Sequence, residues 1–215
     1  INVKDHKGMF LPDRDTFFQS RGDYEIRDYN FAMQHVKQRR VAIDVGAHCG
    51  YWSKRFCDHF DTVVAFEPVT EHHECLVANT NHANNITIHN VCVGANTDPV
   101  YMQVATHNSG MSKVSNTPTD AHTACVTLDN ALSELEHCDI IKIDVEGWEA
   151  QVLLGARKVI AKHKPIIFLE IWDRERATTP VPGILTDMGY VLIGQIDENY
   201  IFKFWPDNSI EKHNE

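Results

Sequence analysis

Apolar residues along the chain fall into short runs that alternate with stretches of helical spacing. The runs near residues 41–45, 62–67 and 86–91 have the pattern of buried strands, and helices are predicted between them near 50–60 and 70–82. In the first helix Trp52, Phe56 and Phe60 recur every four residues and therefore share one face. Strands that alternate with helices predict right-handed crossovers and a parallel sheet.

The alternation resumes in the second half of the chain. Residues 139–147 predict a strand that runs into a turn, and residues 165–171 predict the next strand. The helix between these strands is expected to have an inner face formed by Val152, Leu153, Ala156, Val159 and Ile160. The last two apolar runs, 189–193 and 200–204, have no helical stretch between them, so we expect an antiparallel hairpin across residues 197–199.

The remaining segments are less regular. Residues 1–22 are expected to form an irregular lead-in, followed by a helix over 23–40, so that residues 1–40 precede a single domain at 41–207. Helical spacing lapses between residues 94 and 127, apart from a short strand near 100–104. Because a long loop inside a domain is usually functional, we expect a substrate-side flap there. Residues 208–215 form a polar tail.

Composition restricts the class of protein. The hydrophobic fraction of 43% supports a sizeable core, and no apolar run approaches the length of a membrane span. The net charge of −10 argues against nucleic-acid binding, and the basic run at 37–40 is interpreted as a solvated helix end.

The cysteines and histidines give no sign of a structural metal site. The six cysteines form no C-x-x-C pair, which argues against a disulfide framework or a zinc site. The scattered cysteines and the lack of a recognisable secretory signal at residues 1–5 favour a cytoplasmic location. His72 and His73 are expected to face solvent.

Residues 41–50, with the sequence VAIDVGAHCG, hold the most informative pattern. A β-branched run ends near Asp44, and a turn marked by Gly46 and Gly50 leads into a helix. Such a corner binds nucleotides in doubly wound sheets. Asp44 is expected to point its charge into this corner, where a carboxylate repels pyrophosphate but attracts an ammonium group. The sign of the charge therefore favours S-adenosylmethionine over NAD.

The ends of the next two strands add candidate contacts for an adenosyl ligand. Glu67 lies about 20 residues after Asp44, at the spacing expected for an acid that binds ribose hydroxyls. Pro68 stops that strand. Asn90, at the end of the third strand, is expected to approach the adenine, and a turn asparagine is the alternative.

Several motifs together resemble the FkbM-type methyltransferases. They are VAIDVGAHCG at 41–50, FEP at 66–68, TLD at 127–129, IKIDVEGWE at 141–149, LGA at 154–156 and FLEI at 168–171. The KIDVEG segment is the specific part, since other class I methyltransferases share the glycine loop. Trp148 departs from the small residue that the family more often has, and its bulk either narrows the pocket or packs under the helix.

The resemblance implies an α/β fold, with a Rossmann-like seven-stranded, mostly parallel sheet that ends in an antiparallel hairpin and has helices on both faces. It also implies S-adenosylmethionine as cofactor and a hydroxyl oxygen of a sugar, glycan or small metabolite as methyl acceptor. The oligomeric state stays open. The expected cofactor contacts are Asp44, Gly46, Ala47, Gly50, Glu67, Pro68, Asn90 and Asp144.

Catalysis is assigned to carboxylates at adjacent strand ends. Asp144 and Glu146 are two residues apart on an extended strand end, so their side chains point the same way, and Glu170 ends the next strand. One carboxylate can hold the methionine ammonium while another accepts the proton of an alcohol. For Glu146 a helix-capping role and a metal-ligand role stay open. Mg²⁺ is chemically possible, but a metal is not expected.

Other residues are assigned supporting roles. Ser109, Gly110 and Ser112 in the flap are expected to line the pocket, and Tyr24 with Glu25 is expected to cover the methionine end as a lid. Thr127 and Asp129 are interpreted as helix caps.

Two other functions are consistent with the same corner. An NAD-dependent oxidoreductase would need a loop that tolerates phosphate, which Asp44 opposes. A binding protein without turnover would need no catalytic carboxylates, and Asp144 and Glu146 argue against it.

Overall fold

A sheet of seven strands forms the centre of the computed structural model, which describes residues 3–6, 8–20, 24–172 and 177–206. The strands lie in the order β13–β14–β12–β11–β3–β4–β5. In chain order they are β3 (Val41–Val45), β4 (Thr62–Phe66), β5 (Ile86–His89), β11 (Ile140–Ile143), β12 (Ile166–Glu170), β13 (Tyr190–Ile196) and β14 (Asn199–Phe204).

The strands of the sheet are parallel and antiparallel where the sequence predicts them to be. β12, β11, β3, β4 and β5 pair in parallel. β14 is antiparallel to β12 and to β13, with which it forms a hairpin. The predicted fold class and the C-terminal hairpin are therefore confirmed.

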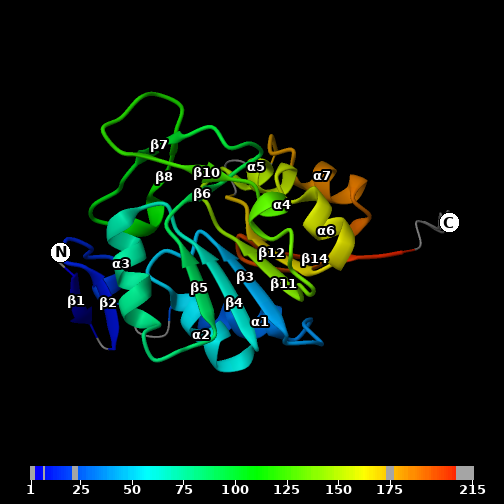
Figure 1. The fold of residues 1–215 in the computed structure, drawn as a ribbon, viewed down its shortest axis with the longest axis horizontal. Coiled ribbons are helices and arrows are strands. Elements are labelled where there is room, and N and C mark those ends of the chain that lie inside the picture. The colour runs from blue at the N-terminus through cyan, green and yellow to red at the C-terminus, as the bar shows by residue number, and fades with distance from the viewer. Residues whose placement is uncertain (1–2, 7, 21–23, 173–176, 207–215) are drawn as a thin grey trace.

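Helices cover both faces of the sheet because successive strand residues point to opposite sides (Figure 1). Ala42 on β3 packs in the same cluster as Trp52 and Phe56, whereas Ile43 packs with Val152 and Leu153. The helices of the first face are α1 (Ile26–Met33), α2 (Tyr51–His59) and α3 (Thr70–Asn79). Those of the second face are α4 (Leu128–Ala131), α5 (Glu149–Leu154), α6 (Arg157–His163) and α7 (Val181–Asp187).

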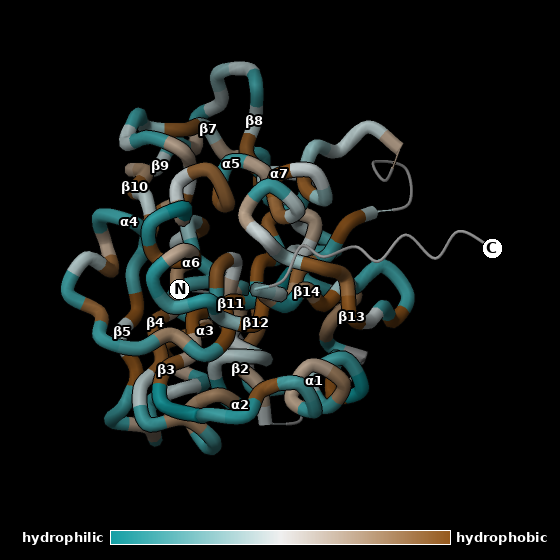
Figure 2. The backbone as a smooth tube through the Cα atoms, turned by 90° about the vertical axis from the view of Figure 1, so that its right-hand side faces the viewer, coloured by the Kyte–Doolittle hydropathy of each residue, from teal (hydrophilic) through white to brown (hydrophobic). Residues whose placement is uncertain are grey.

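Figure 2 shows the hydrophobic segments concentrated in the strands, with hydrophilic segments in the outer loops and helices. Among the described residues there is no helix with the length and apolar character needed to cross a bilayer.

Gly46 lets the turn after β3 approach the end of β11. Its φ is +77°, and a Cβ atom at this position would lie 1.8 Å from the carbonyl oxygen of Asp144. Any other residue would force these two segments apart, so glycine is required where the two strand ends meet.

The N-terminal segment differs from the predicted irregular lead-in. β1 (Val3–His6) and β2 (Met9–Pro12) form an antiparallel hairpin that lies beside α3 (Figure 1). The backbone of Phe10 both donates to and accepts from the side-chain amide of Asn79, at 2.7 and 2.8 Å. Four-residue strands are too short to show a period, and contacts with α3 stabilise them.

The predicted helix over 23–40 is too long. Residue 23 lies outside the described residues, α1 ends at Met33, and the basic run at 37–40 is not a helix end. Arg40 instead pairs with Asp139, whose Oδ1 lies 2.5 Å from its Nη2.

The segment between β5 and α4 forms the predicted flap region, which projects over one end of the main sheet (Figure 1). Its elements are β6 (Cys92–Val93), β7 (Val100–Gln103), the 3-10 turn η2 (Ser109–Met111), β8 (Lys113–Ser115), β9 (His122–Thr123) and β10 (Cys125–Val126). β8, β7 and β9 form a small sheet, and β10 pairs with β6. The predicted short strand near 100–104 is confirmed as β7.

Two helical predictions also need correction. The helix expected after residue 147 is divided into α5 and α6 at Gly155. α7 was not predicted, because Pro182 and Gly183 in its sequence resemble a turn. The polar tail at 208–215 lies outside the described residues.

Candidate active site

A cavity lies at the carboxyl ends of the central strands. Segments 45–48, 66–69 and 144–146, which follow or end β3, β4 and β11, contribute to its wall. The flap closes it with residues 108–114, and 17–18 with 24–25 line it from the N-terminal side. Ligands bind at this edge in open α/β sheets.

One part of the cavity, which we call the carboxylate end, is formed by Asp144, Glu146 and Glu170. Carboxylate oxygens of these three residues lie within 4.8 Å of one another. The indole nitrogen of Trp172 donates to Glu146 Oε2 at 3.0 Å. The expectation that Asp144 and Glu146 point the same way therefore agrees with their positions.

The carboxylate end holds acids of unusual proton affinity. Burial raises the pKa of Glu170 to about 10, and the neighbouring Asp144 and Glu146 add to the shift. Burial and Asp144 also raise the pKa of Glu25 to about 7, although Trp52 donates to its Oε2 at 2.7 Å. The raised pKa favours the protonated form of Glu170 at neutral pH.

Lys142 supplies the positive charge of this end. It is 3% exposed, and its Nζ donates to the carbonyl oxygen of Gly46 at 2.8 Å. The same atom lies 3.4 Å from carboxylate oxygens of Asp44 and of Asp144. Burial alone would lower the pKa of Lys142, but Asp144, Asp44 and Glu25 together raise it.

Asp44 does not point into the cavity as the sequence suggested. It is fully buried, does not belong to the cavity lining, and accepts a hydrogen bond from Ser53 at 2.6 Å. Burial raises its pKa, while Lys142 and Ser53 oppose the shift. Asp44 reaches the cavity only through Lys142, so the acids that face a ligand directly are others.

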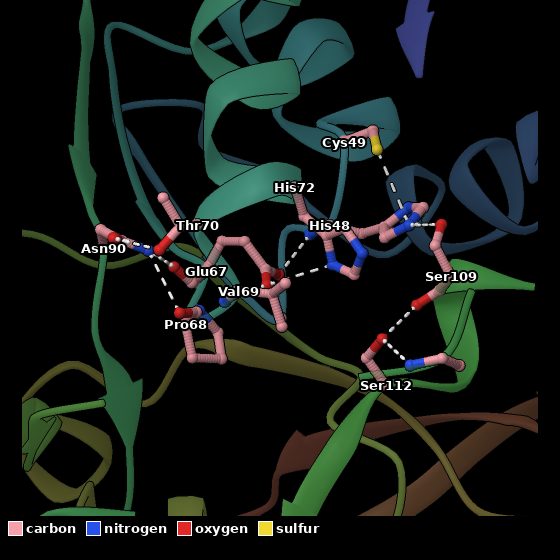
Figure 3. Close-up of polar contacts among 12 residues, drawn as sticks. His48, Cys49, Glu67, Pro68, Val69, Thr70, His72, Asn90, Ser109 and Ser112 are labelled. Carbon is pink, nitrogen blue, oxygen red and sulfur yellow. Dashed lines mark hydrogen bonds and ion pairs between the residues drawn. The ribbon is translucent and has the colours of Figure 1, made fainter. Parts of the chain in front are cut away.

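The opposite part of the cavity, which we call the histidine end, is built around Glu67, His48 and His72 (Figure 3). Glu67 accepts from the backbone nitrogens of His48 and Val69, each at 2.8 Å. His72 Nδ1 lies 3.5 Å from Glu67 Oε1. His72 is 2% exposed, so the expectation that it faces solvent is wrong, because α3 packs against the end of β4.

The structure brings together most of the predicted site residues. Those in the cavity lining are Gly46, Ala47, Glu67, Pro68, Asp144, Glu146 and Glu170. Besides Asp44, two predicted cofactor contacts are not in it. Gly50, with φ +90°, is the N-cap of α2. Asn90 donates from Nδ2 to the carbonyl oxygens of Glu67 and Pro68, at 2.8 and 3.2 Å, and so holds the turn after β4.

The supporting residues have the following positions. Ser109, Gly110 and Ser112 line the cavity, as do Tyr24 and Glu25. Trp148 combines the two positions considered for it: it lines the cavity, and it packs against the core under α5.

The capping assignments are partly corrected. Thr127 is the N-cap of α4 and accepts from the backbone nitrogen of Asn130. Asp129 accepts from the backbone nitrogens of Lys158 and Val159, so it caps α6 and not its own helix. At the start of α5, Glu149 and not Glu146 accepts from the backbone nitrogen of Gly147.

The sequence did not identify the roles of His48, His72 and Lys142. A signal for Lys142 was available, because a lysine between Ile141 and Ile143 in a buried strand needs a buried partner. His48 stands inside the glycine-marked turn, which was another signal.

Within the described residues, Asp144, Glu146 and Glu170 form the group whose oxygens suit a metal ion. Carboxylate oxygens are suitable ligands for Mg²⁺. However, Lys142 already places a positive charge 3.4 Å from Asp144.

A sequence profile described as "Methyltransferase FkbM domain" matches residues 44–192, which is more than half of the chain. This chain belongs to the FkbM methyltransferase family. The match includes the turn after β3, Glu67 and the three acids of the carboxylate end. A sequence search among curated proteins finds no significant match.

Solved structures support the fold. A methyltransferase FkbM from Methylobacillus flagellatus KT is 21% identical, with a TM-score of 0.56, and the match covers 77% of this chain and 44% of that one. The chain thus spans less than half the length of this relative. A precorrin 8w decarboxylase from Methanobacterium thermoautotrophicum is 15% identical, with a TM-score of 0.51 and coverage of 83% and 89%.

A third structure, precorrin-6y C5,15-methyltransferase from Geobacter metallireducens GS-15, is 13% identical with a TM-score of 0.50, over 83% of this chain and 87% of that one. At these identities the likeness shows a shared fold.

Proposed function

We propose that this FkbM-family protein transfers a methyl group from S-adenosylmethionine to a hydroxyl oxygen of a sugar, glycan or small metabolite. The observation that carries the proposal is the cavity itself, which joins a ribose-type acid at one end to a cluster of proton-handling acids at the other. Glu67 lies at the first end, and Glu146 and Glu170 lie at the second.

The charges in the lining fit this cofactor. The lining has five acids and two lysines, namely Glu25, Glu67, Asp144, Glu146, Glu170, Lys113 and Lys142. Such a wall favours a ligand with positive groups and disfavours a pyrophosphate. Asp144 and Glu25 are suited to the ammonium group, and Glu67 is suited to the ribose hydroxyls. The argument against NAD therefore rests on these acids and no longer on Asp44, which does not face the cavity.

When bound, S-adenosylmethionine supplies an electrophilic methyl group on a positively charged sulfur. The protein's part is to hold the acceptor oxygen in line and to remove its proton. Glu146 is the proposed proton acceptor, since Trp172 orients it and Glu170 and Asp144 have other roles. Glu170, whose raised pKa favours the protonated form, is assigned the role of hydrogen-bond donor that orients the acceptor. Glu146 would take up the proton of the acceptor hydroxyl, and bound S-adenosylmethionine would supply the methyl group to the hydroxyl oxygen and leave as S-adenosylhomocysteine.

Thermal unfolding in the presence of three ligands tests the cofactor. S-Adenosylmethionine and S-adenosylhomocysteine should each raise the melting temperature by mass action, and NAD should not. Stabilisation by NAD alone would reject the proposal in favour of an oxidoreductase.

An acceptor screen with a labelled methyl donor tests turnover. Labelled product from sugars, glycans or small alcohols is expected. The Glu146→Gln variant should keep cofactor binding and lose about a hundredfold or more in rate, within the usual range for general-base catalysis. If every acceptor class fails although the cofactor binds, the protein is a binding protein without turnover.

A further inference from the structure

A chain of buried polar contacts links the N-terminal segment to the flap. Asp15, which follows β2, is fully buried. Its Oδ1 accepts from the backbone nitrogens of Phe17 and Phe18, each at 2.9 Å. Its Oδ2 accepts from the backbone nitrogen of Ser109 at 3.1 Å and from the Ser109 hydroxyl. Both oxygens of Asp15 therefore serve as acceptors.

This arrangement fixes the direction of the next hydrogen bond. Because the Ser109 proton is directed to Asp15, Ser109 Oγ must act as acceptor toward His48 Nε2, which lies 2.6 Å away. Nε2 of His48 therefore carries the ring proton, and in a neutral ring Nδ1 then keeps a lone pair. Burial lowers the pKa of His48 well below its usual range, and His72 and Lys142 act in the same direction, so the ring is neutral.

His48 belongs to the same cavity wall as Glu67. The ring lies between those of Phe18 and His72, with centroids 4.8 and 4.6 Å away, and the residue lines the cavity. Its backbone nitrogen donates to Glu67 Oε2 at 2.8 Å, which anchors the residue beside this carboxylate, and the ring is turned toward Ser109 (Figure 3). Cys49 Sγ lies 3.7 Å from Nε2, on the proton-bearing side. In the described part of the chain, the hydrogen bonds of the His48 ring all involve Nε2.

Glu67 has limited capacity for a ribose. Each of its oxygens already accepts one backbone N–H, from His48 or from Val69. A second acceptor at the same place would complement it when two adjacent hydroxyls must be bound.

We propose that His48 is a cofactor-binding residue whose Nδ1 accepts a hydrogen bond from a ribose hydroxyl beside Glu67, and that Asp15 and Ser109 are positioning residues that hold it in the Nε2–H form. The proposal rests on the proposed function, because it needs an adenosyl ligand at Glu67. It also links the N-terminal segment and the flap to cofactor binding.

Two substitutions at one position separate the two ring nitrogens. In His48→Asn the side-chain oxygen can take the place of Nδ1, and asparagine tolerates the φ of +50° at this position. In His48→Gln the amide nitrogen can take the place of Nε2, so the contact with Ser109 survives and the acceptor is lost. The ligands are S-adenosylhomocysteine and its 2′-deoxy and 3′-deoxy analogues, titrated by calorimetry.

We expect His48→Gln to weaken binding of S-adenosylhomocysteine about three- to tenfold, as for one hydrogen bond, and His48→Asn to stay within about twofold of wild type. The wild type should bind one deoxy analogue more weakly, and His48→Gln should lose that discrimination. Unchanged affinity and unchanged discrimination in His48→Gln would overturn the proposal.

The tautomer can be measured without any variant. Nitrogen-15 NMR of the ligand-free protein should show His48 with its proton on Nε2, and Asp15→Asn should shift the population toward Nδ1–H. A wild-type ring protonated on Nδ1 contradicts the inference. Failure of the wild type to bind S-adenosylhomocysteine would instead count against the proposed function, so the two failures are distinguishable.

Discussion

The two ends of the cavity achieve their electrostatic balance in different ways. At the carboxylate end, Asp144, Glu146 and Glu170 crowd together, with Lys142 as the nearby buried cation. At the histidine end, Glu67 accepts from two backbone N–H groups, and His72 Nδ1 lies 3.5 Å from its Oε1. The first end is balanced by charge and by retained protons, and the second by hydrogen bonds.

The difference shows what each end is suited to do. Crowded acids have shifted pKa values, as Glu170 does, and can exchange protons with a substrate. A carboxylate fixed by backbone donors is rigid and suits recognition of neutral hydroxyls. Under the proposed function, one edge of the sheet carries a reactive end and a binding end.

Removal of the cation should produce the largest effect. Lys142→Met leaves the buried Asp44 and the half-buried Asp144 without their counter-ion, so the free energy of unfolding should fall by about 3–5 kcal/mol. Chemical denaturation measures this loss. Lys113→Met is the matched control, because Lys113 also lines the cavity but is exposed, and it should change stability little. Equal stability of the two variants would show that the carboxylate end does not depend on charge balance.

A change at the histidine end should act on affinity. Glu67→Gln removes a charged acceptor. It also places the side-chain amide NH2 group against the backbone N–H of either His48 or Val69, where a carboxylate oxygen now accepts. Binding of S-adenosylhomocysteine should weaken about ten- to a hundredfold, as for hydrogen bonds to a charged group. Calorimetry measures the change, with Glu74→Gln on α3 as control. An affinity within about twofold of wild type would contradict the ribose role.

The third prediction concerns pH. The pKa of Glu170 is about 10 in the fold, against an ordinary value of 4.5, so the folded state binds this proton more tightly than the unfolded state. Its stabilising contribution is complete below about pH 4.5 and declines as the pH rises toward 10. The Glu170→Gln variant keeps the neutral form, so it should gain stability relative to wild type from about pH 5 to about pH 9.

Thermal unfolding across that range measures the difference between the two proteins. Glu136→Gln, at an exposed position, is the control and should keep a constant difference from wild type. A constant difference for Glu170→Gln as well would mean that the acids at this end are not crowded in solution.

The central fold was predictable because its signals are local. The strands at 41–45 and 62–66 are mostly apolar runs, and α2 repeats its apolar positions at helical spacing. The elements that were missed lack such signals. β1 and β2 have four residues each and depend on α3, and α7 contains Pro182 and Gly183.

The sequence predicted those site residues whose position at a strand end is sufficient to bring them to the cavity. Glu67, Asp144, Glu146 and Glu170 follow or end buried strands, so the topology brings them to one edge. Asp44 satisfies the same rule and yet is buried, because Lys142 and Ser53 bind it from other elements. The position of a residue on a strand does not determine which groups its side chain binds.

The sequence by itself determined the order of strands and helices, the turn at Gly46 and the set of acids at the sheet edge, since these depend on neighbouring residues and on one topological rule. Only the tertiary structure decided which acids face the cavity, where Lys142 balances them, and that Asp15 and Ser109 meet at His48. Asp15 and Ser109 are 94 positions apart in the chain, and His48 and Ser109 are 61 apart. Contacts at such separations form only when the packed sheet brings distant loops together, and no local pattern encodes them.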